Sequence, residues 1–500
     1  MKKKLLFVLM IVFAVAITMV GCDTPSASSS PSASVAPSAS IAPSASAAAG
    51  VVYDLSADGT YAEVIGYTGA AKRVRIADTY NGVPVRSIYD SAFKNSAITE
   101  VVIPDSVTSI GSDAFYYCNS LTSVVIPDSV ITIGSDAFNS CYGLTSVVIG
   151  NSVTTIGSSA FYGCNSLTSV VIPDSVTTIG SYAFYGCNNV LKEYEGLQYL
   201  STTTNDYFAV VGIVNKNLST YTMHNDTKLV MARFYVCNSL TNVVIPDSVT
   251  TIGSIAFQEC NNLTSVTIGD SVTTIGSSAF YYCDSLTSVT IPDSVTTIGG
   301  QAFYDCDSLT SVVIGNSVTT IGKRAFDSCT NLTSVVIPDS VTTIGAWAFV
   351  DCDSLTSVVI PDSVTAIGDY AFYDCDSLTN VNYTGTIDQW VQISFDSLGS
   401  NPLYYAKNLY IGGELVTEAV ITTATKISDY AFYYCDSLTN VVIGDSVTTI
   451  GSYAFWSCDS LTELNYEGTV EQWGKISLGS DWKYYLLKKV ICTDGEIQLN

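Results

Sequence analysis

Basic residues are scarce in this chain of 500 residues. It has 20 Lys and Arg against 45 Asp and Glu, a formal net charge of −25. No Lys or Arg occurs from Asn95 to Leu191, or from Phe234 to Gly322. Nucleic-acid binding needs clustered Lys and Arg that displace counterions from phosphates. The sequence therefore predicts no nucleic-acid partner.

Histidine is almost absent as well, since His224 is the single one in the sequence. This disfavours most His-dependent catalysis and His-rich metal sites. No motif combines a nucleophile, a base and a group that orients the base. We therefore expect no enzymatic activity, no cofactor and no metal, and keep an enzyme or carbohydrate-processing protein only as an alternative.

The N-terminus has the pattern of an export signal. Residues 1–22 contain three lysines, an unbroken apolar run from Leu5 to Ile17, and a small-residue end at Gly21-Cys22. The segment from Met19 to Cys22 resembles a bacterial lipobox, in which Cys22 is lipidated. A plain signal peptide, or a membrane-spanning anchor for which the run is short, is the alternative.

Residues 23–49 are a Ser/Ala/Pro tract without apolar periodicity, which predicts a disordered linker. A lipid anchor, then a spacer, then a large ordered body is the order expected of a protein that is displayed at a cell surface. We therefore predict an exported lipoprotein that its N-terminal lipid anchors in the membrane at the bacterial cell surface.

The rest of the chain repeats with a period of 23 residues. The unit at 167–189 reads LTSVVIPDSVTTIGSYAFYGCNN, and its cysteine recurs at the same spacing within each block of repeats. Intact units begin at Ile98, Leu121, Leu144, Leu167, Leu240, Leu263, Leu286, Leu309, Leu332, Leu355 and Leu438. So many similar copies predict a β-rich solenoid, in which each repeat buries its apolar positions against its neighbours.

One unit indicates how the coil is built. A strand points Val124 and Ile126 to one side, while Ser123 and Val125 point to the other. Pro127 lacks an N–H and should end the strand. Gly134 should then permit a turn. The apolar interior is predicted to be completed by Val130, Ile133, Ala137, Phe138 and Cys141.

The repeated pattern LxxVxIPxSVTxIGxxAFxxC resembles the BspA-like leucine-rich-repeat proteins of bacterial and some protist cell surfaces. The resemblance covers nearly all of residues 51–500. It implies a leucine-rich-repeat solenoid with parallel strands on its concave face. It also implies a surface protein for adhesion or ligand binding, without a common catalytic site.

Breaks in the period divide the chain into parts. We predict an N-terminal cap with a degenerate repeat at 50–96, repeat arrays at 97–187, 238–380 and 420–460, an irregular insertion with a degenerate repeat at 188–237, a Trp-containing insertion at 381–419 and a C-terminal Trp-containing cap at 461–500. Thr386 and Gln389, and likewise Thr469 and Gln472, have the spacing of a helix capping box. Trp390 and Trp473 follow in the first helical turn. We interpret them as structural residues that cover the end of the preceding coil, with an aromatic ligand site as the alternative.

Three periodic polar positions are interpreted as structural. The cysteines should be reduced apolar fillers, with disulfides or a metal as alternatives. The serine of Pro-Asp-Ser should satisfy backbone groups at the bend. The aspartate before it, in a row from Asp105 to Asp362, should be a solvated acidic edge, with calcium as the alternative.

The outward strand positions form the candidate ligand face, because they are apolar or hydroxylic and carry no charge. One row is Ser123, Ser146, Ser169, Asn242, Ser265, Ser288, Ser311, Ser334 and Ser357, and the next is Val125, Val148, Val171, Val244, Thr267, Thr290, Val313, Val336 and Val359. β-propensity alone could also explain Val and Thr here. We predict that this face binds an extracellular protein or glycoprotein in adhesion or attachment, with a passive spacer as the alternative.

Overall fold

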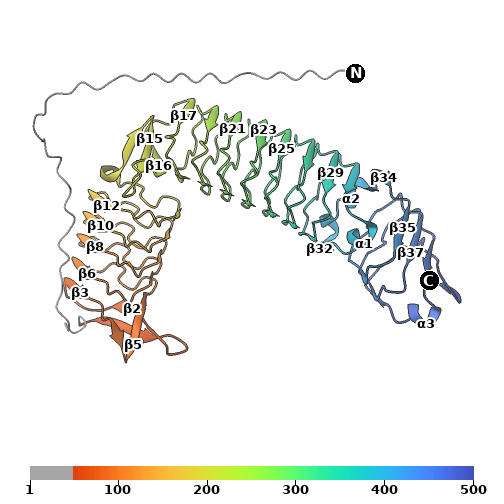
Figure 1. The fold of residues 1–500 in the computed structure, drawn as a ribbon, viewed down its shortest axis with the longest axis horizontal. Coiled ribbons are helices and arrows are strands. Elements are labelled where there is room, and N and C mark those ends of the chain that lie inside the picture. Colours follow the sequence, from red (N-terminus) through yellow and green to blue (C-terminus); the bar gives the residue numbers. More distant parts are fainter. Residues whose placement is uncertain (1–48, 500) are drawn as a thin grey trace, which may run out of the picture. The chain divides into compact units, whose positions relative to one another are not determined.

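The computed structural model describes residues 49–499, which lie within one compact unit, Ala47–Asn500. Figure 1 shows its strands lying side by side as successive rungs. The repeats form a parallel β-solenoid, as the sequence predicts. No helix between residues 49 and 499 has the length and apolar content that crossing a membrane requires.

Each coil contributes one strand to a sheet that we call the front sheet. Equivalent residues pair directly, so Val147 lies beside Val124 on one side and Val170 on the other. The first section consists of β3 (Arg73–Arg75), β6 (Glu100–Val102), β8 (Ser123–Val125), β10 (Ser146–Val148) and β12 (Ser169–Val171).

The front sheet continues in two further sections. The second consists of β17 (Thr220–Thr222), β19 (Asn242–Val244), β21 (Ser265–Thr267), β23 (Ser288–Thr290), β25 (Ser311–Val313), β27 (Ser334–Val336), β29 (Ser357–Ile360), β31 (Asn380–Tyr383), β33 (Leu409–Ile411) and β34 (Glu414–Leu415). The third consists of β35 (Glu418–Ile421), β37 (Asn440–Ile443), β39 (Glu463–Tyr466), β41 (Lys489–Cys492) and β42 (Gly495–Gln498).

A second sheet, which the repeat pattern did not lead us to expect, is built from short strands at Thr-Ile. Its first section contains β1 (Val51–Leu55), β2 (Ala62–Tyr67), β4 (Thr79–Tyr80), β5 (Val83–Ile88), β7 (Ser109–Ile110), β9 (Thr132–Ile133), β11 (Thr155–Ile156) and β13 (Thr178–Ile179). β1 and β2 form an antiparallel hairpin at the start of this section.

The later sections of the second sheet follow the same pattern. They contain β14 (Lys192–Tyr194), β15 (Leu197–Leu200), β16 (Ala209–Ile213), β18 (Leu229–Val230), β20 (Thr251–Ile252), β22 (Thr274–Ile275), β24 (Thr297–Ile298), β26 (Thr320–Ile321), β28 (Thr343–Ile344), β30 (Ala366–Ile367) and β32 (Ser394–Phe395), and then β36 (Lys426–Ile427), β38 (Thr449–Ile450) and β40 (Ser477–Leu478).

The core consists of columns of identical side chains. Val124 and Ile126 are 2% and 1% exposed, and the Leu, Ala, Phe and Cys positions of the repeats are buried. The phenylalanine rings stack along the coils, with 4.9 Å between the centroids of Phe115 and Phe138. Each repeat therefore buries its apolar surface against the next, as a solenoid requires.

Gly134 serves a different purpose from the one predicted. It does not adopt a positive φ; the residues after it in the same coil that do are Asp136, at 56°, and Ser140, at 58°. A Cβ atom on Gly134 would instead lie 2.6 Å from the carbonyl carbon of Gly111 in the preceding coil. The glycine column is required because successive coils approach too closely for any side chain.

The insertion at 188–237 replaces regular coils with an antiparallel meander. After the 3₁₀ turn η1 (Asn188–Val190), β14 pairs with β15 and β15 with β16, and β16 then lies parallel to β18. Phe234 resumes the aromatic stack, 4.7 Å from Phe257. The front sheet is interrupted here, because its first section ends at β12 and the next begins at β17.

Both predicted capping boxes are present. They begin the short helices α1 (Ile387–Trp390) and α3 (Val470–Trp473), while η2 (Leu398–Ser400) and α2 (Leu403–Ala406) follow α1. Trp390 is fully buried, and its Nε1 donates a hydrogen bond to the Ala431 carbonyl at 2.9 Å. The front sheet is interrupted between β34 and β35, and the second sheet between β32 and β36, yet the apolar core continues through these segments.

Candidate binding surface

The predicted ligand-face residues lie on the solvent side of the front sheet. Val125, Val313 and Val336 are 61%, 58% and 63% exposed, whereas the alternating residues Val124 and Ile126 are buried. Serines and asparagine flank this row, exposed or half-buried. We call the two rows together the Ser/Val ribbon.

The register of the sheet brings the ribbon residues together in two groups. In the first section Ser146 and Val148 pair with Ser123 and Val125, and the third strand adds Ser169 and Val171. The second section aligns the residues from Asn242 to Val359 in the same way. The two groups do not form one ladder, because β12 and β17 are not paired.

Several ribbon positions were missed in the repeat pattern. Thr220 and Thr222 pair with Asn242 and Val244, so they extend the second group by one strand. Asn380 and Asn382 extend it at the other end, beside Ser357 and Val359. The alternation around Tyr221 and Met223, both buried, was the signal that could have revealed the first pair.

Charged side chains occur on front strands outside the ribbon. Glu100 on β6 forms an ion pair with Arg73 at 2.9 Å, and Glu463 on β39 pairs with Lys489 at 3.0 Å. Between β8 and β31, the outward positions of the front strands are uncharged. An uncharged, apolar-and-hydroxyl surface can bind by excluding water, because few charged groups must be desolvated.

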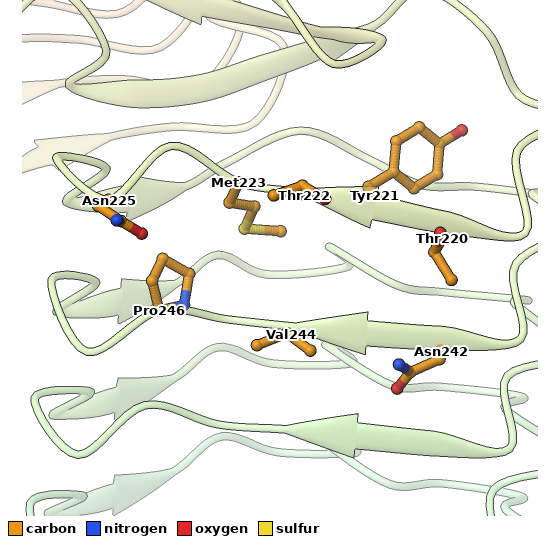
Figure 2. Close-up of a pocket in the computed structure, with 8 residues that line it drawn as sticks. All are labelled: Thr220, Tyr221, Thr222, Met223, Asn225, Asn242, Val244 and Pro246. Carbon is orange, nitrogen blue, oxygen red and sulfur yellow. The ribbon is translucent and has the colours of Figure 1, made fainter.

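The ribbon is hollowed where its second section begins. Figure 2 shows Thr220 and Thr222 on β17 beside Asn242 and Val244 on β19. Together with Tyr221, Met223, Asn225 and Pro246 they line a cavity of about 390 Å³. β17 is the edge strand of its section, so one side of it has no front-sheet neighbour.

Threonines along the edge of the ribbon are structural. The hydroxyl of Thr122 donates to the Thr99 carbonyl at 3.1 Å, and that of Thr145 donates to the Thr122 carbonyl at 2.9 Å. Equivalent bonds join the later coils. This ladder of side-chain hydrogen bonds was not predicted, because it exists only between stacked coils.

The Pro-Asp-Ser serines act on the backbone, as predicted. Ser294 Oγ donates to the Val272 carbonyl of the preceding coil at 2.7 Å, and Ser340 Oγ to that of Val318 at the same distance. The aspartate before the serine also has a structural bond in some coils. Asp293 Oδ1 accepts from the Asn316 backbone N–H at 2.8 Å.

The described cysteines are free and buried. In most coils the thiol donates to the phenylalanine carbonyl of the preceding coil; for Cys283 and Phe257 the distance is 3.2 Å. Burial raises the pKa of the Cys435 thiol to about 11 and that of Cys283 further. The thiols are therefore protonated at neutral pH and act as weak donors inside the core. Cys22 lies outside the described residues.

His224 packs within the insertion. Its ring stacks on Tyr207 with 3.9 Å between centroids, and its Nδ1 accepts the Asp226 backbone N–H at 3.2 Å. Among residues 49–499, no three His, Cys, Asp or Glu side chains are grouped so that they could hold a metal ion. The geometry of the described residues thus offers a binding surface as its best candidate site.

The chain matches the sequence model of the family described as "BspA type Leucine rich repeat region". The match includes six copies, over residues 86–210, 227–355, 296–414 and 407–481. Together these ranges cover well over half of the chain. A comparison with curated proteins gave no match.

Solved bacterial structures are similar over most of the chain. A leucine-rich repeat protein from Bacteroides ovatus ATCC 8483 is 25% identical over 89% of this chain and 98% of its own, with a TM-score of 0.36. A leucine rich cell surface protein from Faecalibacterium prausnitzii A2-165 is 27% identical over 88% of this chain and 99% of its own, with a TM-score of 0.27.

Proposed function

Since the chain belongs to the BspA-type leucine-rich-repeat family, we propose that it is a cell-surface protein that binds a protein or glycoprotein partner through its front sheet, in adhesion or attachment. The family is one of surface proteins, and its repeat fold is generally non-enzymatic. The Ser/Val ribbon is the proposed contact surface.

The observation that carries the proposal is the exposed valine row. Val125, Val313 and Val336 are more than half exposed, so these apolar side chains do not contribute to the core. Val125 pairs in register with Val148 in the first section, and Val313 pairs with Val336 in the second, so each section carries an apolar strip bordered by hydroxyl groups. Monomeric proteins rarely keep contiguous apolar strips exposed unless they bind something.

The test is a comparison of matched variants of the full-length protein. Val313→Lys combined with Val336→Lys places two charges on the ribbon, and Thr297→Lys combined with Thr320→Lys places two on exposed positions of the second sheet. Attachment of protein-coated beads to matrix- and cell-coated surfaces is measured. We expect the ribbon variant to lose at least about tenfold in binding, because a desolvated charge is costly at an interface.

Three results would count against the proposal. If both double variants bind as strongly as the unchanged protein, neither face makes the contact; if the unchanged protein itself does not attach, the repeats provide length alone and the chain is a passive spacer of the cell envelope. If only the second-sheet variant loses binding, the partner contacts the other face.

The proposal includes anchoring at the cell surface by a lipid on Cys22. The support is the apolar run, the lipobox-like ending and the Ser/Ala/Pro linker that follow one another in residues 1–49. We expect Cys22→Ala to abolish incorporation of a labelled fatty acid and to release the protein from the membrane fraction. Equal labelling of both proteins would show that Cys22 is not the lipidated residue.

A further inference from the structure

A second cavity lies where the tyrosines of the first array meet the insertion. It has a volume of about 470 Å³ and is lined by residues that include Tyr162, Tyr182, Tyr185, Lys216, Arg233 and Tyr235. None of its lining residues belongs to the Ser/Val ribbon, and none lines the cavity at β17 and β19.

Two cations line this cavity in a strongly acidic chain. Neither Arg233 nor Lys216 has a carboxylate within ion-pair distance among residues 49–499. Lys216 Nζ donates to the Tyr235 carbonyl at 3.3 Å, and neutral groups also hold the guanidinium of Arg233. Both charges are therefore available to an anion.

The guanidinium of Arg233 is fixed in position. It lies 4.1 Å from the ring centroid of Tyr235, and its two terminal nitrogens donate to the Tyr182 hydroxyl and to Gln258 Oε1. Each of these terminal nitrogens carries two N–H groups, so each still has one to offer. A preorganised, planar guanidinium is well suited to a carboxylate.

Aromatic faces complete the cavity. Tyr162 and Tyr185 stack at 5.2 Å, and they are 37% and 56% exposed. Tyr182 stands edge-on to Tyr185. Rigid tyrosine rings offer an apolar face together with a hydroxyl, and they lose little entropy on binding. The C–H face of a pyranose ring and its hydroxyl groups match this combination.

We propose that this cavity binds an acidic saccharide, a sugar whose ring carries a carboxylate. The carboxylate lies against Arg233 and Lys216, and the sugar ring lies against Tyr185 and Tyr162. The site is separate from the Ser/Val ribbon, so the proposal stands whether or not the ribbon binds a partner.

Calorimetric titration of the full-length protein in detergent tests this. The acidic probes are 3′-sialyllactose and a hyaluronan tetrasaccharide, and the neutral ones are lactose and chitotetraose. We expect at least one acidic probe to bind at one site per chain, and about tenfold or more tighter than its neutral counterpart. Raising the salt concentration should weaken that binding. Equal affinity for acidic and neutral probes, or binding of neither acidic probe, would overturn the proposal.

Matched variants locate the site. Arg233→Gln should lose at least about tenfold in affinity, but it also removes the bonds to Tyr182 and Gln258. Lys216→Gln and Tyr185→Ala therefore change exposed side chains of the cavity, with Lys323→Gln and Tyr117→Ala as controls elsewhere on the repeats. We expect the first pair to weaken binding three- to tenfold and the controls to leave it unchanged. Cavity variants that bind like their controls would refute the assignment, and V336K should bind the saccharide normally.

Discussion

At the residue scale, single polar atoms join each coil to the one before it. The serine hydroxyl of Pro-Asp-Ser, the thiol of the repeat cysteine and the threonine hydroxyl before each front strand all donate to a carbonyl of the preceding coil. The Thr287 and Phe257 carbonyls also accept a backbone N–H, from Thr310 and Cys260, so at these positions the side chain adds a second hydrogen bond.

Ser294→Ala tests the serine bond. The change leaves the Val272 carbonyl without its side-chain donor, so we expect the free energy of unfolding to fall by about 1 kcal/mol. Urea unfolding followed by circular dichroism measures it. Ser271→Ala is the control, because Ser271 is the exposed serine of a Gly-Asp-Ser variant. An equal effect of both changes would contradict the structural role of the hydroxyl.

Asp327 is a buried carboxylate, 3% exposed, with Arg324 at 3.3 Å and the Ser328 hydroxyl at 2.9 Å. Burial raises its pKa to about 6 from 3.8, although Ser328 and Arg324 oppose the shift. The folded state thus holds this proton more tightly than the unfolded state. The stability that the proton confers is present below about pH 4 and is lost as the pH rises through about 6.

Asp327→Asn should remove this pH dependence. Because the amide is neutral at every pH, we expect the variant to gain about 1 kcal/mol relative to the unchanged protein at pH 7.5, and less at pH 4. Unfolding midpoints measured across this range test it, with the exposed Asp339→Asn as the control. An unaltered pH profile would show that Asp327 titrates normally.

At the element scale, the two short Trp helices look alike in sequence but differ in their contacts. Both begin with a capping box and both bury their tryptophan. Only α1 is followed by a further intact repeat, and Asp388 in its first turn accepts backbone N–H bonds from Thr422, Thr423 and Ala424 at 2.9 to 3.0 Å. In α3 the equivalent Glu471 pairs with Lys475 at the surface.

Asp388→Asn should therefore destabilise the joint to the last coils. Burial opposes ionisation of Asp388, but the backbone N–H groups outweigh it and lower the pKa. The contribution is present at neutral pH and is lost as the pH falls below about 4. We expect a loss of about 1 to 3 kcal/mol at pH 7 and faster hydrogen exchange at residues 422–424. Glu471→Gln is the control and should change neither quantity.

At the scale of the whole molecule, the chain is a stack of similar coils. Each coil contacts mainly the coils before and after it, so stability is approximately additive along the stack. The insertion at 188–237 is the exception, because both sheets are interrupted there: the front sheet between β12 and β17, and the second sheet between β13 and β14.

Removing one whole repeat tests this additivity. Deletion of residues 286–308 joins two equivalent coil positions, so we expect a folded protein whose urea midpoint falls by less than about 0.5 M. Deletion of residues 286–297 is the control: it brings the front-sheet position of one coil against the second sheet of the next and should abolish cooperative unfolding. A folded product from the shorter deletion would contradict the stacking register.

The sequence by itself determined the coil. The 23-residue period, the alternation of Val124, Val125 and Ile126, and the Thr-x-x-Gln boxes identified the solenoid, the outward rows and the capped helices, because each depends on residues close together in the chain. Gly134 was interpreted wrongly and the Thr-Ile sheet was missed, since both depend on how closely one coil approaches the next.

Only the tertiary structure decided which repeats form one surface. It separated β12 from β17, added Thr220 and Thr222 to the ribbon, and brought Arg233 within reach of Tyr182, 51 positions earlier in the chain. Periodicity predicts what each repeat does with its neighbours. Where the period breaks, the contacts depend on packing between distant segments, which no local pattern encodes.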